Sequence, residues 1–224
     1  MDIEPRHLAI ERRVRYAVLE GRPGDIAQVW FVLHGYNQLA HRFLRLFATI
    51  DDGTRRIVAP EGLHRQYIDH AARTVGASWM TSEDRLTDIE DYVAYLDRLY
   101  RATFDEAGLD PAAVEVVGLG FSQGVHTLCR WVAFGDSRMD RAILWGATVP
   151  PDLDLDAHRA GLAAADLHLV FGDEDEFYGA DAVWSHEARL RAADIPFTTL
   201  GFRGGHRIDA ETLRRLTDLS AAGA

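Results

Sequence analysis

The segment Gly120-Phe121-Ser122-Gln123-Gly124 matches the pattern G-x-S-x-G. It directly follows an apolar run at 114–119 and opens a stretch, 123–134, whose apolar residues have helical spacing. A serine on a sharp turn between a strand and a helix exposes its hydroxyl at the end of the strand. Small residues two positions before and after it let strand and helix pass closely. We therefore predict that Ser122 is a nucleophile.

A serine hydroxyl needs a general base, and the base needs an orienting carboxylate. His206 ends a Gly-Gly-His loop after an expected strand at 197–200, and it is the last histidine of the chain. Two carboxylates, Asp173 and Asp175, follow an expected strand at 167–171. The G-x-x-D spacing from the preceding glycine favours Asp175, and Asp173 stays the alternative. The resulting chain order, serine then aspartate then histidine, is typical of one class of hydrolytic sites.

Acyl transfer also needs hydrogen-bond donors for the oxyanion, each worth ~3 kcal/mol. The backbone N–H of Gln123, directly after the nucleophile and at a helix N-terminus, is one candidate. A second is expected in the His34-Gly35-Tyr36 loop after the early strand, where Gly35 lets the backbone turn toward Ser122. We predict that the N–H of Tyr36 is this second donor.

Short apolar runs alternate with longer amphipathic stretches, which predicts a mostly parallel sheet with helices on both faces. A single α/β domain over residues 1–224 fits this pattern, and the segment between the strands at 141–145 and 167–171 is too short for a lid domain. The remaining strands are expected at 13–20, 26–33, 56–59, 114–119 and 197–200. Helices are expected at 38–50, 84–107, 123–134, 180–193 and 210–219, and an irregular segment at 61–82.

Composition excludes several function classes. The chain is 47% apolar and carries 24 basic residues, all arginine, against 35 acidic ones, for a formal net charge of −11. This charge argues against nucleic acid and against stable membrane association, because both surfaces are anionic. The lack of lysine excludes Schiff-base chemistry, and the single Cys129 excludes an intrachain disulfide. No metal-ligand spacing is present, so we expect no metal and no cofactor. Without an apolar span or targeting segment, we predict a soluble cytoplasmic protein.

Five segments in this order, HGYNQ, GASWM, GFSQG, FGDED and GGH, resemble the carboxylesterase/phospholipase family of α/β-hydrolases, which includes acyl-protein thioesterases. The resemblance spans residues 27–216. It implies Ser122 as nucleophile, Asp175 as acid and His206 as base, with Tyr36 and Gln123 as oxyanion donors. It also implies an α/β-hydrolase fold without a lid. The chain departs from the family at Met80-Thr81, at Val125 and at Glu176.

These observations predict a serine carboxylester hydrolase for short- to medium-chain acyl esters, small molecules that it cleaves through an acyl-enzyme. Trp79, Phe121 and Tyr178 are candidate apolar walls of the substrate pocket, with plain core packing as the alternative for each. Lysophospholipase or acyl thioesterase activity on longer chains is an alternative function. A non-catalytic binding protein of the same fold is a second, remoter one. The sequence leaves the oligomeric state open, a homodimer included.

Overall fold

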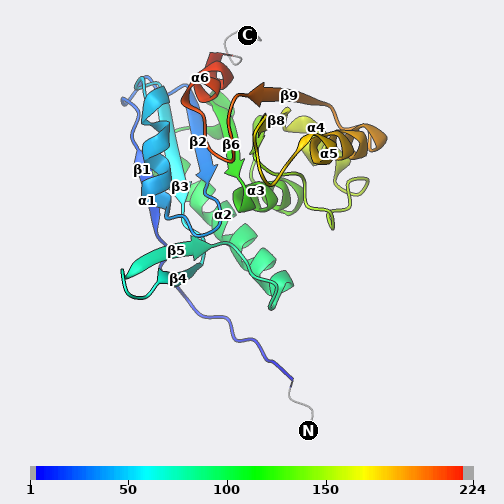
Figure 1. Cartoon of the computed structure of the whole chain (residues 1–224). Coiled ribbons are helices and arrows are strands. Elements are labelled where there is room, and N and C mark those ends of the chain that lie inside the picture. Colours follow the sequence, from blue (N-terminus) through cyan, green and yellow to red (C-terminus); the bar gives the residue numbers. More distant parts are fainter. Residues whose placement is uncertain (1–3, 219–224) are drawn as a thin grey trace.

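The computed structural model describes residues 4–218, and within that range the main sheet has seven strands in the order β1-β3-β2-β6-β7-β8-β9 (Figure 1). All neighbouring pairs are parallel except β1 with β3. The carboxyl ends of six strands therefore meet at one edge, where open α/β sheets bind ligands. The strands are β1 Tyr16–Leu19, β2 Gln28–Leu33, β3 Arg55–Pro60, β6 Glu115–Phe121, β7 Arg141–Trp145, β8 Leu167–Gly172 and β9 Phe197–Phe202.

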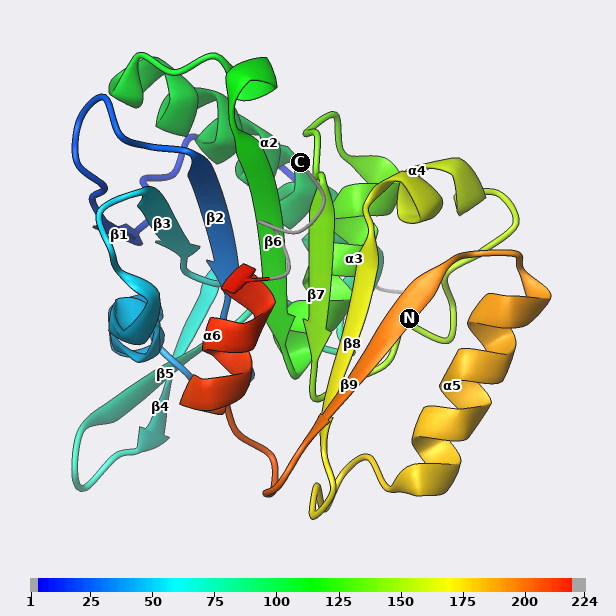
Figure 2. The same cartoon turned by 90° about the horizontal axis from the view of Figure 1, so that it is seen from above.

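Helices cover both faces of this sheet (Figure 2). Strand β2 illustrates why: Val29, Phe31 and Leu33 face one apolar core, and Trp30 and Val32 face the other. The predicted mostly parallel sheet with helices on both faces is confirmed. The first core packs against α2 Arg85–Ala107, α3 Gln123–Phe134, α4 Arg159–Ala164 and α5 Ala180–Ala192; the second packs against α1 Ala40–Phe43, the 3-10 helix η1 Leu44–Ile50 and α6 Ala210–Asp218. A second 3-10 turn, η2, spans Pro111–Ala113.

Most predicted elements are present, with shifted ends. The helix expected at 38–50 begins as α1 and continues as η1, because apolar side chains repeating every three or four residues fit either helix type. The strand expected at 13–20 is confined to β1, and the helix α4 was not predicted. The helix expected at 210–219 reaches the end of the described range, and Leu219 lies outside it. Between β7 and β8 the chain forms only loop and α4, and no lid domain is seen there.

The segment expected to be irregular, 61–82, contains a β-hairpin, so that prediction was wrong. Strands β4 His64–Asp69 and β5 Thr74–Ser78 pair antiparallel in a separate sheet. Five of the six residues of β4 are exposed, so this strand lacks the apolar alternation that reveals a strand in sequence. The hairpin projects beyond the end of the main sheet (Figure 1). None of the helices within residues 4–218 combines the length and apolarity needed to cross a bilayer.

Candidate active site

Ser122 lies on a strained turn between β6 and α3. Its backbone has φ 53° and ψ −118°, a conformation that non-glycine residues rarely adopt. The flanking glycines permit the turn, because a Cβ at Gly120 would lie 2.4 Å from the Gly124 carbonyl oxygen and one at Gly124 would lie 2.2 Å from the Leu33 carbonyl oxygen. The Ser122 side chain makes no capping hydrogen bond to α3. Its hydroxyl therefore stays available at the helix N-terminus.

Asp175 and His206 form a largely buried hydrogen-bonded pair beside this turn. The His206 Nδ1 atom lies 2.9 Å from Asp175 Oδ2, and their side chains are 12% and 1% exposed. The other carboxylate oxygen of Asp175 accepts the backbone N–H groups of Phe177 and Tyr178. A carboxylate that only accepts fixes the imidazole with its proton on Nδ1 and leaves Nε2 free to accept one. Asp173 is exposed and accepts the N–H of Gly204 instead, so the carboxylate that faces His206 is Asp175.

Two contacts bring His206 to the end of β6. Its ring packs on Phe121, the residue before Ser122, with ring centroids 4.9 Å apart. A Cβ at Gly146, just after β7, would lie 3.0 Å from its Cε1 atom, so the absence of a side chain there makes room for the imidazole. Among the described residues no hydrogen bond joins Ser122 to His206. Such bonds are often long in ligand-free enzymes and tighten when substrate binds.

The loop after β2 closely approaches Ser122. A Cβ at Gly35 would lie only 3.2 Å from Ser122 Cβ, so glycine makes this close approach possible without a shift of the neighbouring side chains. The N–H of Gly35 donates to Gln38 Oε1 and is already used. Within residues 4–218, the N–H groups of Tyr36 and Gln123 donate to no protein acceptor. Both predicted oxyanion donors are thus unpaired backbone amides close to Ser122.

Four hydrogen bonds hold this loop, which we call the oxyanion loop (residues 34–38). Buried His34 accepts the N–H of Gly62 at Nε2, so its Nδ1–H donates to the Gly35 carbonyl at 2.8 Å. Burial lowers the pKa of His34, which keeps it in this neutral form. Strand β5 then pairs with the loop, since Asn37 N–H donates to Ala77 and Ala77 N–H donates back to Gln38. Fixing the Gly35 carbonyl also fixes the opposite N–H of the same peptide, that of Tyr36.

Solved structures with this fold extend over nearly the whole chain. Esterase PE8 has a TM-score of 0.72 and 20% identity, over 94% of this chain and 99% of its own. The fold is that of an α/β-hydrolase. Acyl-protein thioesterase 2 of Zea mays also has a TM-score of 0.72, at 16% identity over 93% of this chain and 98% of its own. A carboxylesterase from Mesorhizobium loti has a TM-score of 0.72 and 19% identity, over 94% of this chain and 95% of its own. No protein-family model and no curated protein matches the sequence.

Within the α/β-hydrolase fold, the Gln123 side chain has a role that the sequence did not reveal. Its Oε1 accepts the N–H of Trp79, and its Nε2 donates to the Met80 carbonyl and to Ser78 Oγ. The side-chain amide of the residue after Ser122 thereby links α3 to the chain that leaves β5. This bond set fixes the hairpin, and through it the oxyanion loop, relative to Ser122.

The three predicted pocket walls lie in different surroundings. Trp79 is fully buried, donates its indole N–H to the His34 carbonyl and stacks on the His34 ring, so it supports the oxyanion loop from the core and forms no open wall. Phe121 is 6% exposed and packs between Phe43 and His206. Tyr178 is half-buried beside Asp175, and burial raises the pKa of its hydroxyl. None of these three residues lines the cleft beside the oxyanion loop.

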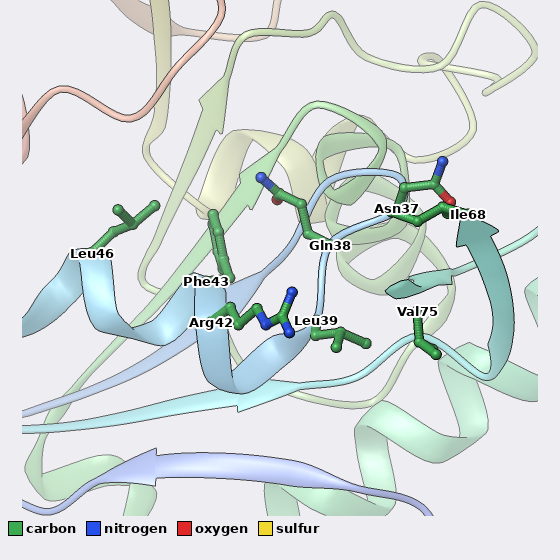
Figure 3. Close-up of a pocket in the computed structure, with 8 residues that line it drawn as sticks. All are labelled: Asn37, Gln38, Leu39, Arg42, Phe43, Leu46, Ile68 and Val75. Carbon is green, nitrogen blue, oxygen red and sulfur yellow. The ribbon is translucent and has the colours of Figure 1, made fainter. Parts of the chain in front are cut away.

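An open cleft of about 220 Å³ adjoins the oxyanion loop, between α1 and the β4–β5 hairpin (Figure 3). It begins at Gln38, whose side chain holds the N–H of Gly35. Phe43, which also lines the cleft, stacks on Phe121 with ring centroids 6.1 Å apart. Its lining comprises Asn37, Gln38, Leu39, Arg42, Phe43, Leu46, Ile68 and Val75. Sequence reasoning missed these residues, because the hairpin that forms one wall was not predicted.

Proposed function

We propose that this chain is a serine ester hydrolase in which Ser122 is the nucleophile, His206 the general base and Asp175 the orienting acid. The observation that carries the proposal is the Asp175–His206 pair, 2.9 Å between Oδ2 and Nδ1, beside a serine on a strained strand-to-helix turn. Esterases and thioesterases among the solved structures of this fold support the reaction class. We expect the site to act without metal or cofactor.

In the acylation step, Ser122 Oγ attacks the carbonyl carbon of the ester while His206 Nε2 takes the hydroxyl proton. Negative charge develops on the carbonyl oxygen, where the N–H groups of Tyr36 and Gln123 donate to it. Asp175 stabilises the imidazolium that forms. The C–O bond to the alcohol then breaks, and the imidazolium returns its proton to the leaving alkoxide. The products are a free alcohol and an acyl-Ser122 ester.

Deacylation repeats these roles with water. His206 removes a proton from a water molecule as its oxygen attacks the acyl carbon, and the same two N–H groups stabilise the second oxyanion. Collapse expels Ser122 Oγ, which regains its proton from His206. Ester and water become alcohol and carboxylic acid, and the enzyme is restored.

The size of the cleft favours short- to medium-chain acyl groups. Its volume of about 220 Å³ is below the ~300–1,000 Å³ of pockets that enclose drug-sized ligands. Longer acyl chains, as in lysophospholipase or thioesterase substrates, would extend past Leu46 into solvent. We therefore propose a small-molecule acyl ester as substrate, and we retain a cytoplasmic location as part of the proposal.

Hydrolysis of p-nitrophenyl esters from acetate to palmitate tests the proposal, with Ser122→Ala and His206→Ala measured alongside. Each variant is expected to lose at least ~10³-fold in kcat. Ser185→Ala is the matched control, since Ser185 is exposed on α5. A fluorophosphonate probe is expected to label the wild type and the control but not Ser122→Ala.

The chain-length profile separates the alternatives. A maximum at short or medium chains supports the carboxylesterase, whereas a maximum at long chains supports the lysophospholipase or thioesterase alternative. Folded protein with neither turnover nor labelling would point to a binding protein. Activity of Ser122→Ala close to wild type would overturn the assignment of the nucleophile.

A further inference from the structure

The cleft beside the oxyanion loop contains one charged side chain, that of Arg42. Its other walls include the apolar side chains of Leu39, Phe43, Leu46 and Val75. Figure 3 shows Arg42 extending from α1 toward the side of the cleft where Leu39 lies. Arg42 forms no ion pair with any residue in the range 4–218, as judged from the side chains that the structure describes. A guanidinium without a protein partner can accept an anionic group from a ligand.

The two segments that form the cleft carry more basic than acidic residues although the protein is acidic. The segment 38–50 carries Arg42 and Arg45 and no acidic residue. The hairpin segment 64–78 carries Arg73 with one aspartate, Asp69, and also Arg65, whose charge is paired with Glu61 at 3.5 Å. The whole chain has a formal net charge of −11. Local positive charge beside a cleft with apolar walls concentrates anions there, even when the molecule as a whole repels them. The cleft is therefore suited to a ligand with an apolar body and a negative end.

Sheet order indicates which part of an ester would enter this cleft. The loop after β2 and the cleft lie on the β3 side of β6, whereas Asp175 and His206 follow β8 and β9 on its other side. His206 must reach the leaving oxygen to protonate it, so the alcohol occupies its side of Ser122. The acyl chain then runs from the ester carbonyl carbon that Ser122 attacks, past Gln38 and Phe43, into the cleft.

We propose that Arg42 binds a carboxylate at the far end of the acyl chain, so that the preferred substrates are monoesters of dicarboxylic acids, cleaved at the esterified end. The inference rests on the proposed ester hydrolysis and names its substrate class. The planar guanidinium matches a carboxylate with two parallel hydrogen bonds. The methylene chain between the two carboxyl groups packs on Phe43, Leu46 and Val75.

The first test compares p-nitrophenyl monoesters of adipate and suberate with the same esters capped by a methyl ester at the far carboxylate. Wild type is expected to cleave the free carboxylates with kcat/KM about 10- to 100-fold higher, the range for a charge-assisted hydrogen-bonded pair. Arg42→Gln removes this advantage, chiefly through KM, and changes kcat/KM for the capped esters less than about 3-fold. Arg42→Lys keeps the charge without the planar geometry and retains an intermediate preference.

Arg45→Gln is the matched control, because Arg45 lies on the same helical segment but does not line the cleft. A loss there equal to that of Arg42→Gln would overturn the inference, since general surface charge would then explain the preference. Equal cleavage of free and capped esters by wild type would also overturn it. So would a preference for 4-acetoxybenzoate, which carries its carboxylate on the alcohol, over p-nitrophenyl suberate.

Binding of suberate itself separates this inference from the proposed function. Calorimetric titration is expected to give binding to wild type and to Ser122→Ala, with a Kd at least about 10-fold weaker for Arg42→Gln. Suberate binding without ester turnover would sustain the anion site and defeat the hydrolase proposal. Turnover of neutral esters that depends on Ser122, without suberate binding, would do the reverse.

Discussion

The two sides of Ser122 are constructed differently. On the side of β8 and β9, the proposed acid and base are side chains, Asp175 and His206, whose exposed fractions are 1% and 12%. On the side of β2 and β3, the site is bordered by the backbone N–H of Tyr36, a residue that is 54% exposed, and by an open cleft. One side depends on the identity of two residues, and the other depends on the shape of a loop.

This difference follows from what each side must do. Proton transfer needs particular side chains held at hydrogen-bond distance, so burial and a second set of bonds, such as those from Phe177 and Tyr178 to Asp175, are suited to it. A backbone N–H is the same in every residue except proline, so an oxyanion donor needs only a rigid loop. The β4–β5 hairpin supplies that rigidity by pairing with residues 37 and 38.

The largest effect in this comparison is expected on the side-chain side, from Asp175→Asn. An amide at this position can no longer accept from His206 Nδ1–H and also bind both backbone N–H groups in one orientation, which favours the wrong imidazole tautomer. We expect kcat to fall by at least ~10²-fold with KM little changed. The measurement is steady-state hydrolysis of p-nitrophenyl butyrate, with melting curves to verify folding.

Asp173→Asn is the matched control for that substitution. The asparagine side chain keeps an oxygen acceptor for the N–H of Gly204, so we expect less than ~3-fold change in kcat. If Asp173→Asn were the more damaging of the two, the acid would have to be reassigned to Asp173, the alternative that the sequence left open.

A smaller effect is expected on the loop side, from Gly76→Ala in β5. A Cβ at this position would lie 2.6 Å from the Asn37 carbonyl oxygen and 2.7 Å from its Cα, so the hairpin or the oxyanion loop must move. Displacing a loop that carries one of the proposed oxyanion donors should cost less than the ~10²–10³-fold of removing a donor outright, so we expect kcat to fall about 10- to 100-fold. Steady-state hydrolysis of p-nitrophenyl butyrate measures this loss.

Gly201→Ala in β9 is the control for that loss, because a Cβ there would meet no atom within 4 Å. Unchanged kcat in Gly76→Ala, with a normal melting temperature, would mean that the hairpin does not position the oxyanion loop. The backbone side of the comparison would then lose its basis.

The sequence predicted the side-chain side of the site far better than the backbone side. The turn around Ser122 is set by its sequence neighbours, namely Gly120, Gly124 and the flanking strand and helix. The motif can therefore be recognised from sequence without tertiary structure. The role of Gly76 depends on a hairpin that is exposed along β4 and pairs with a distant loop. Such long-range pairing leaves no periodic signal, which is why the cleft and Arg42 were not foreseen.

Buried histidines give the smallest expected effect, and it concerns stability rather than catalysis. His186 on α5 is 5% exposed, its Nε2 has no hydrogen-bond partner among the described residues, and burial lowers its pKa to about 4. Its ordinary pKa of 6.5 applies in the unfolded chain, which therefore binds a proton first as the pH falls. The contribution of His186 to the free energy of unfolding is therefore fully present above pH 6.5 and is lost progressively between pH 6.5 and about pH 4. His34, whose pKa is also lowered by burial, acts in the same direction.

Replacing His186 with leucine separates these two histidines. We expect the decrease in unfolding free energy between pH 7 and pH 5 to shrink by about 1–2 kcal/mol in His186→Leu, since one fewer proton is taken up on unfolding at acid pH. Denaturant unfolding at both pH values measures it. Because His186 lies on α5, away from the oxyanion loop, kcat for p-nitrophenyl butyrate at pH 7 should stay within ~2-fold of wild type. An undiminished pH effect on stability would assign the acid sensitivity to the other two histidines whose pKa burial lowers, His34 in the oxyanion loop and His126 on α3.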